Sequence, residues 1–595
     1  MGDALSDVAI KEVTEPVAVE TKRSYRFVLH EWVVASVGSV LLAIAMLWLI
    51  PPYAADLAAA GVKPATIGDP AHTIVGDGGD TAAQAWLVAW NGHALKHGIF
   101  GGLWDTNAFY PGKYALALND TLIGYTPAGL IGNGVTATLL RYNILFVLAF
   151  ALAFLGGYAL LRQLGADRVG SAVAGAALAY APWRYGHVGH LNILSTGGIT
   201  LAVAMLARGH GWSMTRGYRP DRVRPGWAVA GWLVAAWQVS LGFGMGLVFV
   251  YLLAAACLCA AIGWLVSGRP PLERRLVLGD LTGGLIFTAV TGYFAYAYEQ
   301  VREFYPDVLR SWDYVGTFSP VPRSLLVAPG YSLPWGTLHA AGRAALGAAD
   351  NEKALLCGYL LYLLAFGGMF LSVWSVRQRL LLLAGTVVGV LFALGTHGPL
   401  YRLLYLYVPG FDGGRTPGRL ILWPTICLAV LAAGFVTGLA RAARAAARPE
   451  RAAVAARVVT VPLLILVLLE GMPDLAHVRE PAEPAAMAAA TAPLMVLPSD
   501  DGFDSTALLW STNDFPTMVN GVASYNTPDR QTVRDVMQTF PSPGSLDLLR
   551  RLGIRSVVVL RDRVTGTPYE LALGVESMPG VTRRDIGPDV LFTID

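Results

Sequence analysis

Charged side chains are scarce in this sequence. Asp, Glu, Lys and Arg together make up only 14% of its 595 residues, whereas soluble globular domains carry about 25%. The formal net charge of +3 is too small to indicate a nucleic-acid partner. The shortage of charge therefore argues against an ordinary soluble domain and against a nucleic-acid-binding protein.

Cysteine and the short catalytic motifs of several enzyme classes are also scarce or absent. The four cysteines all lie inside apolar runs, which offers neither a disulfide framework nor CxxC metal-binding spacing; they are Cys257, Cys259, Cys357 and Cys427. The chain has no Walker A sequence, no GxGxxG that enters a helix, no HExxH and no GxSxG. Phosphate hydrolysis driven by ATP therefore has no local support.

The chain contains instead a series of long apolar runs. Hydrophobic residues make up 54% of the sequence, and the mean hydropathy is +0.50. Because many runs approach the length that crosses a bilayer, the sequence predicts a polytopic α-helical membrane protein. About eleven spans are expected, at residues 32–50, 142–161, 168–182, 190–207, 226–242, 243–266, 276–297, 354–376, 380–396, 419–440 and 458–472.

The partly apolar run 122–140 is not counted among these spans. Pro127 and several glycines interrupt it, which favours a re-entrant or interfacial segment. Counting it as a span would invert every later connection and place the arginine-rich loop 441–457 outside.

Arginine placement predicts the topology. Arginines gather in alternate connections, which by the positive-inside rule face the cytoplasm; they lie at 162–168, 208–224, 269–275, 377–379 and 441–457. The polar segment 1–29 is predicted to be a cytoplasmic tail, and no small-residue cleavage site follows the first apolar run, so that run is expected to stay as a helix. We therefore expect a multi-pass protein of the inner (plasma) membrane with an extracytoplasmic C-terminus.

Three domains follow from this topology. They are the tail 1–29, a transmembrane domain 30–472 with a large first outer loop 51–140, and an outer C-terminal domain 473–595. The last domain is expected to be a small α/β unit, with strands at 494–497 and 556–560 and helices at 532–539 and 545–552.

The first outer loop carries two carboxylates on a glycine-rich stretch. Asp77 and Asp80 lie in Gly76–Trp90, and Gln84 follows one turn later. A carboxylate held close to the bilayer can act as the general base that takes a proton from an acceptor hydroxyl. The plainer alternative is that Asp80 only caps the helix that it precedes.

A second acidic site, Asn119-Asp120, lies further along the same loop. Two carboxylates can divide the tasks of base and positioning group, or can help to bind a divalent metal. An Asx turn is the structural alternative. Both residues are candidates for substrate binding.

The turn 183–192 is the most unusual polar cluster near the membrane. Arg184 offers a planar fork for phosphate oxygens, while His187 and His190 can donate hydrogen bonds or a proton. The spacing of the two histidines is compatible with zinc, but the sequence shows no clear third ligand. A helix–helix hydrogen-bond network would also explain such a cluster.

Two further arginines, Arg415 and Arg419, lie in the loop 410–419 on the predicted outer side. Cations there go against the positive-inside trend. A local anionic partner such as a phosphate would explain them, as would an ion pair with Asp412.

These pieces resemble the GT-C superfamily of polytopic glycosyltransferases, and in particular large bacterial integral-membrane families of this type. The resemblance is carried by short segments in order: Asp80 with Trp86 and Trp90, Phe109-Tyr110-Pro111-Gly112, Gly189–Leu194 after Ala181-Pro182, Gly410–Arg419, and Asn520-Gly521 to Tyr525. The resemblance implies an inverting transfer of a sugar from a polyprenyl-phosphate donor to a glycan, lipid or protein acceptor.

The resemblance also implies roles for individual residues. Asp80 matches the base in the first outer loop best, with Asp77 as its rival, and Arg184, His190 and Arg415 would hold the lipid phosphate. Dependence on a divalent metal and the identity of the sugar stay open. Two alternatives stay open as well: a flippase of a lipid-linked saccharide, and a non-catalytic assembly factor that docks a partner through 473–595.

Overall fold

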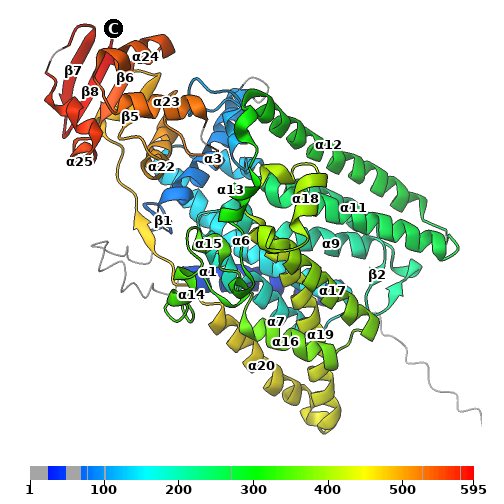
Figure 1. Cartoon of the computed structure of the whole chain (residues 1–595). Helices are drawn as coiled ribbons and strands as arrows, with labels where there is room; N and C mark the ends of the chain where they lie inside the picture. Colours follow the sequence, from blue (N-terminus) through cyan, green and yellow to red (C-terminus); the bar gives the residue numbers. More distant parts are fainter. Residues whose placement is uncertain are drawn as a thin grey trace, which may run out of the picture.

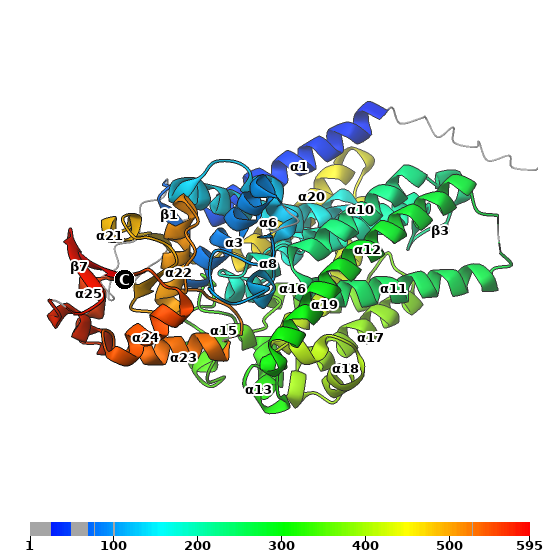
Figure 2. The same ribbon diagram turned by 90° about the horizontal axis from the view of Figure 1, so that it is seen from above.

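The computed structural model describes residues 25–48, 69–76, 78–98, 102–269, 271–525, 527–576 and 578–595. Asp77 and most of the predicted tail 1–29 lie outside the described residues. A long helical bundle fills most of the molecule, and a small sheet domain with the C-terminus lies at one end of it (Figure 1). Viewed from above, the hairpin of β2 (Trp212–Ser213) and β3 (Gly217–Tyr218) lies at the opposite end (Figure 2).

Eight helical stretches in the described part of the chain have the length and composition to cross a membrane. They are Leu29–Leu47, Gly134–Leu164, Leu191–Gly209, Phe243–Val266, Arg274–Phe304, Val376–Ala393, Pro417–Ala446 and Pro449–Glu470. The helices within them are α1 (Tyr25–Leu47), α6 (Gly134–Leu164), α8 (Leu191–Leu194), α9 (Gly197–Gly209), α11 (Phe243–Val266), α12 (Arg274–Phe304), α17 (Val376–Ala393), α19 (Leu422–Ala446) and α20 (Ala452–Glu470).

The remaining predicted spans fall on shorter helices, α7 (Arg168–Ala179), α10 (Pro225–Leu241) and α16 (Tyr359–Phe370). Leu285 on α12 is 70% exposed and Phe370 on α16 is 72% exposed. Large apolar side chains exposed along apolar helices are typical of a lipid-facing surface. The predicted class, a polytopic α-helical membrane protein with a small C-terminal α/β domain, is therefore confirmed.

Small residues let the central helices approach closely. A side chain at Gly156 of α6 would lie 2.3 Å from the backbone oxygen of Gly197, where α9 begins. Gly197 would clash in turn with the backbone of Leu152 at 2.4 Å. The two helices therefore pack backbone against backbone, as membrane helices with small interfacial residues do.

The connection between α1 and α6 is built from short pieces around one longer helix. These are β1 (Thr73–Val75), α3 (Gly79–His97), the single turns Ala115–Leu118 and Ile123–Tyr125, and α5 (Thr126–Gly129). The part of 122–140 that precedes Gly134 holds only the turn 123–125 and the short helix α5, and the rest begins α6. This arrangement places the helix α3, and with it Asp80, at the end of the bundle that carries the sheet domain (Figure 1).

The C-terminal sheet has the strand order β5-β6-β8-β7. The strands are β5 (Leu494–Leu497), β6 (Ser556–Val559), β7 (Val581–Ile586) and β8 (Asp589–Ile594), with β5 parallel to β6 and the other pairs antiparallel. Both predicted strands are buried along their whole length. The helices beside them are α22 (Asp501–Trp510), α23 (Pro528–Met537), α24 (Pro543–Leu552) and α25 (Arg561–Val564).

This domain is tied to the connection that contains α3. Strand β4 (His477–Arg479) pairs with β1, and Asn107 accepts a hydrogen bond from Trp86 on α3 while its own amide donates to Ser511 at 3.1 Å. The remaining elements are the hairpin β2 (Trp212–Ser213) with β3 (Gly217–Tyr218), and the short helices α13 (Trp312–Thr317), α14 (Ala340–Ala344), α15 (Asp350–Lys353), α18 (Tyr401–Tyr407) and α21 (Ala485–Ala488).

Candidate functional site

A cavity of about 530 Å³ lies where the connection, the bundle and the C-terminal domain meet. Its walls come from the start of α3, residues 117–120, His190 with the start of α8, the first turns of α11, the last turns of α12, residues 308–310, the loop 409–420 and residues 522–525. The cavity therefore collects segments that are hundreds of residues apart. Of the predicted site residues, it is lined by Asp80, Gln84, Asn119, Asp120, His190, Arg415 and Arg419.

Asp80 is presented to this cavity by the first turn of α3. The chain enters the helix through Gly78, whose φ of 82° is left-handed and favours glycine. One carboxylate oxygen, Oδ2, lies 3.6 Å from Nε2 of His190, and the side chain remains 57% exposed. Gly189 allows this approach, because a side chain there would meet Cβ of Asp80 at 2.9 Å. The carboxylate is thus held in place and still open to the cavity.

Gln84 lies on the same face of α3, one turn after Asp80. Its side chain lines the cavity, and Oε1 is buried without a hydrogen-bond partner in the described part of the chain. A buried acceptor of this kind costs free energy until something donates to it. A hydroxyl of a bound sugar or acceptor would supply that donor.

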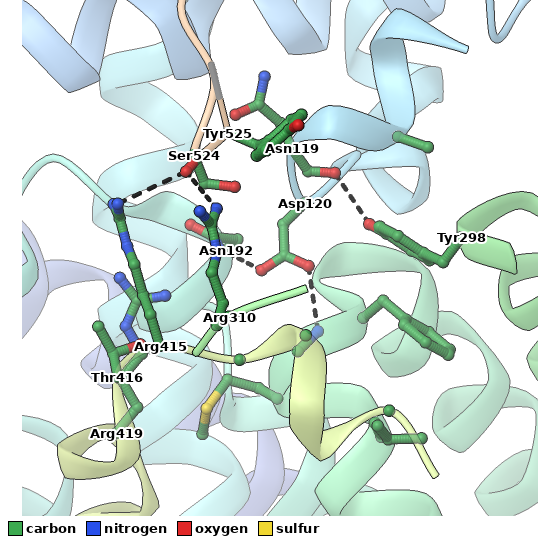
Figure 3. Close-up of a pocket in the computed structure, with 18 of the residues that line it drawn as sticks. Asn119, Asp120, Asn192, Tyr298, Arg310, Arg415, Thr416, Arg419, Ser524 and Tyr525 are labelled. Atoms are coloured by element: carbon green, nitrogen blue, oxygen red, sulfur yellow. Dashed lines mark hydrogen bonds between the residues drawn. The ribbon is translucent and has the colours of Figure 1, made fainter. Parts of the chain in front are cut away.

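Asp120, unlike Asp80, accepts a hydrogen bond at each of its carboxylate oxygens. Its Oδ2 accepts a hydrogen bond from Nδ2 of Asn192 at 2.5 Å, and its Oδ1 accepts one from the backbone N–H of Gly244 at 3.0 Å. Tyr298 donates to the backbone oxygen of Asn119 at 2.8 Å (Figure 3). Because both oxygens are engaged, Asp120 suits a positioning role better than that of a proton acceptor.

Four arginines line the cavity, and two of them are neutralised by carboxylates. Arg419 forms a bidentate pair with Glu352, with Nη2 2.5 Å from Oε1 and Nε 3.1 Å from Oε2. Arg302 lies 3.5 Å from Asp412. These two guanidinium groups already have anionic partners, so they are poor candidates for holding a ligand phosphate.

Arg310 and Arg415 have no carboxylate within ion-pair distance among the residues that the structure describes. Both point toward the backbone oxygen of Ser524 and donate to it, Arg415 at 3.5 Å (Figure 3). Burial lowers the pKa of Arg310, and the neighbouring charge of Arg415 lowers it further. Since the two positive charges repel each other, an anion between them would stabilise both.

Arg184, in contrast, does not line the cavity. It is fully buried, donates to the backbone oxygen of Leu194 at 2.7 Å and to Thr196 at 3.1 Å, and lies over the ring of Phe150 at 5.1 Å. These contacts hold the turn that follows α7 in place. Arg184 has the place of a structural residue and not that of a phosphate ligand.

We expect Arg184→Ala to lower stability without a specific effect on substrate binding. The substitution leaves the oxygen of Leu194 without its donor and opens a void against Phe150, which together cost about 2–4 kcal/mol. Thermal unfolding of the purified protein should show a lower Tm than the exposed control Arg402→Ala. An unchanged Tm would contradict the structural role.

The two histidines of the turn differ in where they lie. His190 lines the cavity, while His187 is fully buried behind it and its Nδ1 lies 3.7 Å from Glu352. Burial lowers the pKa of His187 to about 3 and also lowers the pKa of His190. Both rings are therefore neutral near pH 7, and neither adds positive charge to a phosphate site.

Two neutral imidazoles beside a carboxylate can also bind a metal ion. His187, His190 and Glu352 offer ligand atoms that all lie within 4.8 Å of one another. On both histidines Nδ1 is buried and has no hydrogen-bond partner among the described residues. The set fits a divalent ion such as Zn²⁺. Glu352, however, is already paired with Arg419. Burial alone would raise the pKa of this carboxyl, but the pairing with Arg419 holds it low.

We expect Zn²⁺ to raise the Tm of the purified protein and the substitution His187→Gln to remove that increase. An ion that binds only the folded state stabilises it by mass action, and His187→Gln deletes one ligand while it leaves the Glu352–Arg419 pair intact. A Tm that does not respond to Zn²⁺ would exclude a zinc site there and leave Glu352 with Arg419 as its partner.

Two important side chains escaped the sequence reasoning. Arg310 lies in the predicted outer loop 298–353, where the argument used for Arg415 would also have singled it out. Glu352 lies in the same loop, but no spacing in the sequence connects it to His187, so its role depends on the fold alone.

A scan against protein-family models gives no match, and a search of the curated proteins gives none either. Several solved structures are similar. The archaeal oligosaccharyltransferase AglB from Archaeoglobus fulgidus, in complex with an inhibitory peptide and a dolichol-phosphate, is 14% identical, with 92% of this chain and 72% of that one covered and a TM-score of 0.43. The arabinofuranosyltransferase AftD from Mycobacteria is 16% identical, with coverages of 96% and 41% and a TM-score of 0.49.

ArnT from Cupriavidus metallidurans is also similar, at 14% identity, with 95% of this chain and 98% of ArnT covered and a TM-score of 0.42. Identities of 14–16% and TM-scores below 0.5 make these likenesses too distant to assign an activity. The function is therefore inferred from the side chains of the cavity.

Proposed function

We propose that this chain is an integral-membrane glycosyltransferase that takes a sugar from a polyprenyl-phosphate donor and transfers it, with inversion, to an acceptor on the extracytoplasmic side. One observation carries the proposal. An open carboxylate, Asp80, lines the same cavity as Arg310 and Arg415, two arginines that have no carboxylate partner among the described residues, at one end of a membrane bundle. A lipid-anchored phosphate can reach such a place without leaving the bilayer.

Each group has a task in this reaction. Asp80 removes the proton from an acceptor hydroxyl, whose oxygen then forms a bond to the anomeric carbon of the sugar from the face opposite the leaving group. The bond between that carbon and the phosphate oxygen breaks, and polyprenyl phosphate leaves with the electron pair. Arg310 and Arg415 stabilise the negative charge that develops on this phosphate, through charge-assisted hydrogen bonds.

The remaining polar groups of the cavity orient the substrates. Oε1 of Gln84 and Oδ1 of Asn192 are buried acceptors without partners in the described residues, and both residues line the cavity. Sugar and acceptor hydroxyls are the donors that would satisfy them. Asp120 fixes the amide of Asn192 and so sets the direction of its free oxygen.

The proposal includes the topology predicted from the arginines. The cavity end would face the extracytoplasmic side of the inner membrane, and the hairpin of β2 and β3, with Arg216 and Arg219 nearby, would face the cytoplasm. Cysteine-accessibility labelling in intact cells tests this, with a cysteine at Asp313 for the cavity end and one at Arg216 for the other end. Labelling of the second but not the first would contradict it.

The function is tested with purified protein in proteoliposomes and a panel of polyprenyl-phosphate-linked sugars. We expect at least one donor to lose its sugar to an acceptor, with release of polyprenyl phosphate. Movement of a lipid-linked sugar across the bilayer with no covalent change would overturn the proposal in favour of a flippase.

A further inference from the structure

A loop of the C-terminal domain forms part of the cavity wall. Residues 522–525 all line the cavity, although they belong to the domain built on the sheet. Nδ2 of Asn119 donates to the backbone oxygen of Val522 at 3.0 Å, and Oγ of Ser524 donates to the backbone oxygen of Leu118 at 3.0 Å. The loop is therefore bonded directly to the segment that carries Asp120.

The same loop contacts both unpaired arginines. The backbone oxygen of Ser524 accepts hydrogen bonds from Arg310 and Arg415 (Figure 3). The guanidinium of Arg310 lies 5.5 Å from the ring centre of Tyr525 and 5.4 Å from that of Tyr314. Two rings and one carbonyl thus hold a cation that no carboxylate neutralises among the described residues.

The base of the loop is anchored in the domain by a buried ion network. Asp504 is fully buried, accepts from Nδ2 of Asn520 at 2.7 Å and from the N–H of Gly521 at 3.2 Å, and pairs with Arg534 at 2.9 Å and Arg530 at 3.2 Å. A buried charge with this many partners gives a well-defined geometry. The position of the loop is therefore set by the fold of the C-terminal domain.

A close approach fixes where the loop crosses the first connection. The N–H of Phe109 donates to the backbone oxygen of Asn520 at 3.2 Å. A side chain at Gly521 would lie 2.7 Å from the ring of Phe109, so only glycine fits there while the ring stays in place. This accounts for the Asn520-Gly521 segment, which the proposed reaction does not itself use.

We infer that the C-terminal domain completes the phosphate site, with Ser524 and Tyr525 as positioning residues that hold Arg310 and Arg415 against the phosphate of the lipid donor. This inference rests on the proposed function. It assigns the domain a part in donor binding and, through the two arginines, in the departure of the phosphate. Removal of the Tyr525 ring should therefore weaken the binding of lipid phosphate and leave the proton transfer by Asp80 intact.

The test measures binding of a short-chain polyprenyl monophosphate to the purified full chain. Tyr525→Ala should raise the Kd by roughly three- to thirtyfold, the range of a partly desolvated cation–π contact, while Tyr525→Phe, which keeps the ring, should bind within about twofold of wild type. Once a donor is known, its KM should rise in Tyr525→Ala, and kcat should fall by less than in Arg310→Ala, because the guanidinium group is still present. Tyr407→Ala, at an exposed tyrosine outside the cavity, is the matched control.

A second pair of variants tests the loop without changing its tip. Gly521→Ala should displace the loop and raise the Kd, and the double variant Gly521→Ala with Phe109→Leu, which removes the clashing ring, should bring it back toward wild type. If wild type binds the lipid phosphate and both Tyr525→Ala and Gly521→Ala bind it equally well, this inference fails alone. If wild type does not bind it at all, the proposed function fails with it.

Discussion

Asp80→Asn is expected to reduce the rate of sugar transfer by about 10²–10⁴-fold, the usual contribution of a general base. Asparagine has nearly the same shape but cannot accept the proton of the acceptor hydroxyl. The carboxylate is 57% exposed, and the neutral ring of His190 lies 3.6 Å away. Because little of the fold depends on it, the Tm should stay close to that of wild type. Single-turnover rates at saturating donor would measure the effect.

Two other aspartates serve as comparisons for this result. Asp313→Asn changes an exposed carboxylate outside the cavity and should leave the rate unchanged. Asp77→Asn tests the rival base, which lies outside the described residues. Wild-type rates in both Asp77→Asn and Asp80→Asn would remove the mechanism proposed for this cavity.

Loss of the unpaired arginines is expected to act on the donor. Arg310→Ala and Arg415→Ala should each raise the donor KM by roughly 10- to 100-fold, because a hydrogen bond to a charged group contributes about 1.5–3 kcal/mol. The rate at saturating donor should fall as well, since the leaving phosphate loses part of its stabilisation. Arg415→Lys should recover part of the loss, because lysine keeps the charge but not the planar fork.

The effects of the two arginines should not add. Both would bind one phosphate and both donate to Ser524, so the double variant should lose less than the product of the single losses. Arg402→Ala, an exposed arginine outside the cavity, is the control. Donor KM values that stay at the wild-type level in both single variants would place the phosphate elsewhere.

The sequence predicted much of the architecture, since hydropathy and turn patterns are local properties. The run 243–266 coincides with α11, and the apolar stretch 494–497 is the buried strand β5. The first connection was also predicted without a full span before α6. Such features depend on residues that are neighbours along the chain, and burial in lipid or in a sheet requires a recognisable pattern of apolar residues.

The charge pairing in the site could not be predicted in the same way. Arg184 and Arg419 seemed as suitable for phosphate as Arg415, yet the first is buried among backbone acceptors and the second is paired with Glu352. Whether an arginine is neutralised depends on which carboxylate the fold brings near it. That partner lies 67 positions away for Arg419, too far for any spacing rule.

The protonation state of the two histidines could not be predicted from the sequence either. A sequence allows His187 and His190 to be phosphate donors, metal ligands or structural residues, because the pKa depends on burial. In the structure burial lowers the pKa of both rings, and Glu352 lies beside them. Only the three-dimensional arrangement could favour metal ligation over charge-assisted phosphate binding.

The central claim is tested most directly by a cryo-EM structure of the full chain with a polyprenyl monophosphate bound. We expect the phosphate within hydrogen-bond distance of the guanidinium groups of Arg310 and Arg415, with its ester chain leading into the membrane and Asp80 open to the same cavity. A phosphate bound away from this arginine pair, at another place on the bundle, would contradict the account.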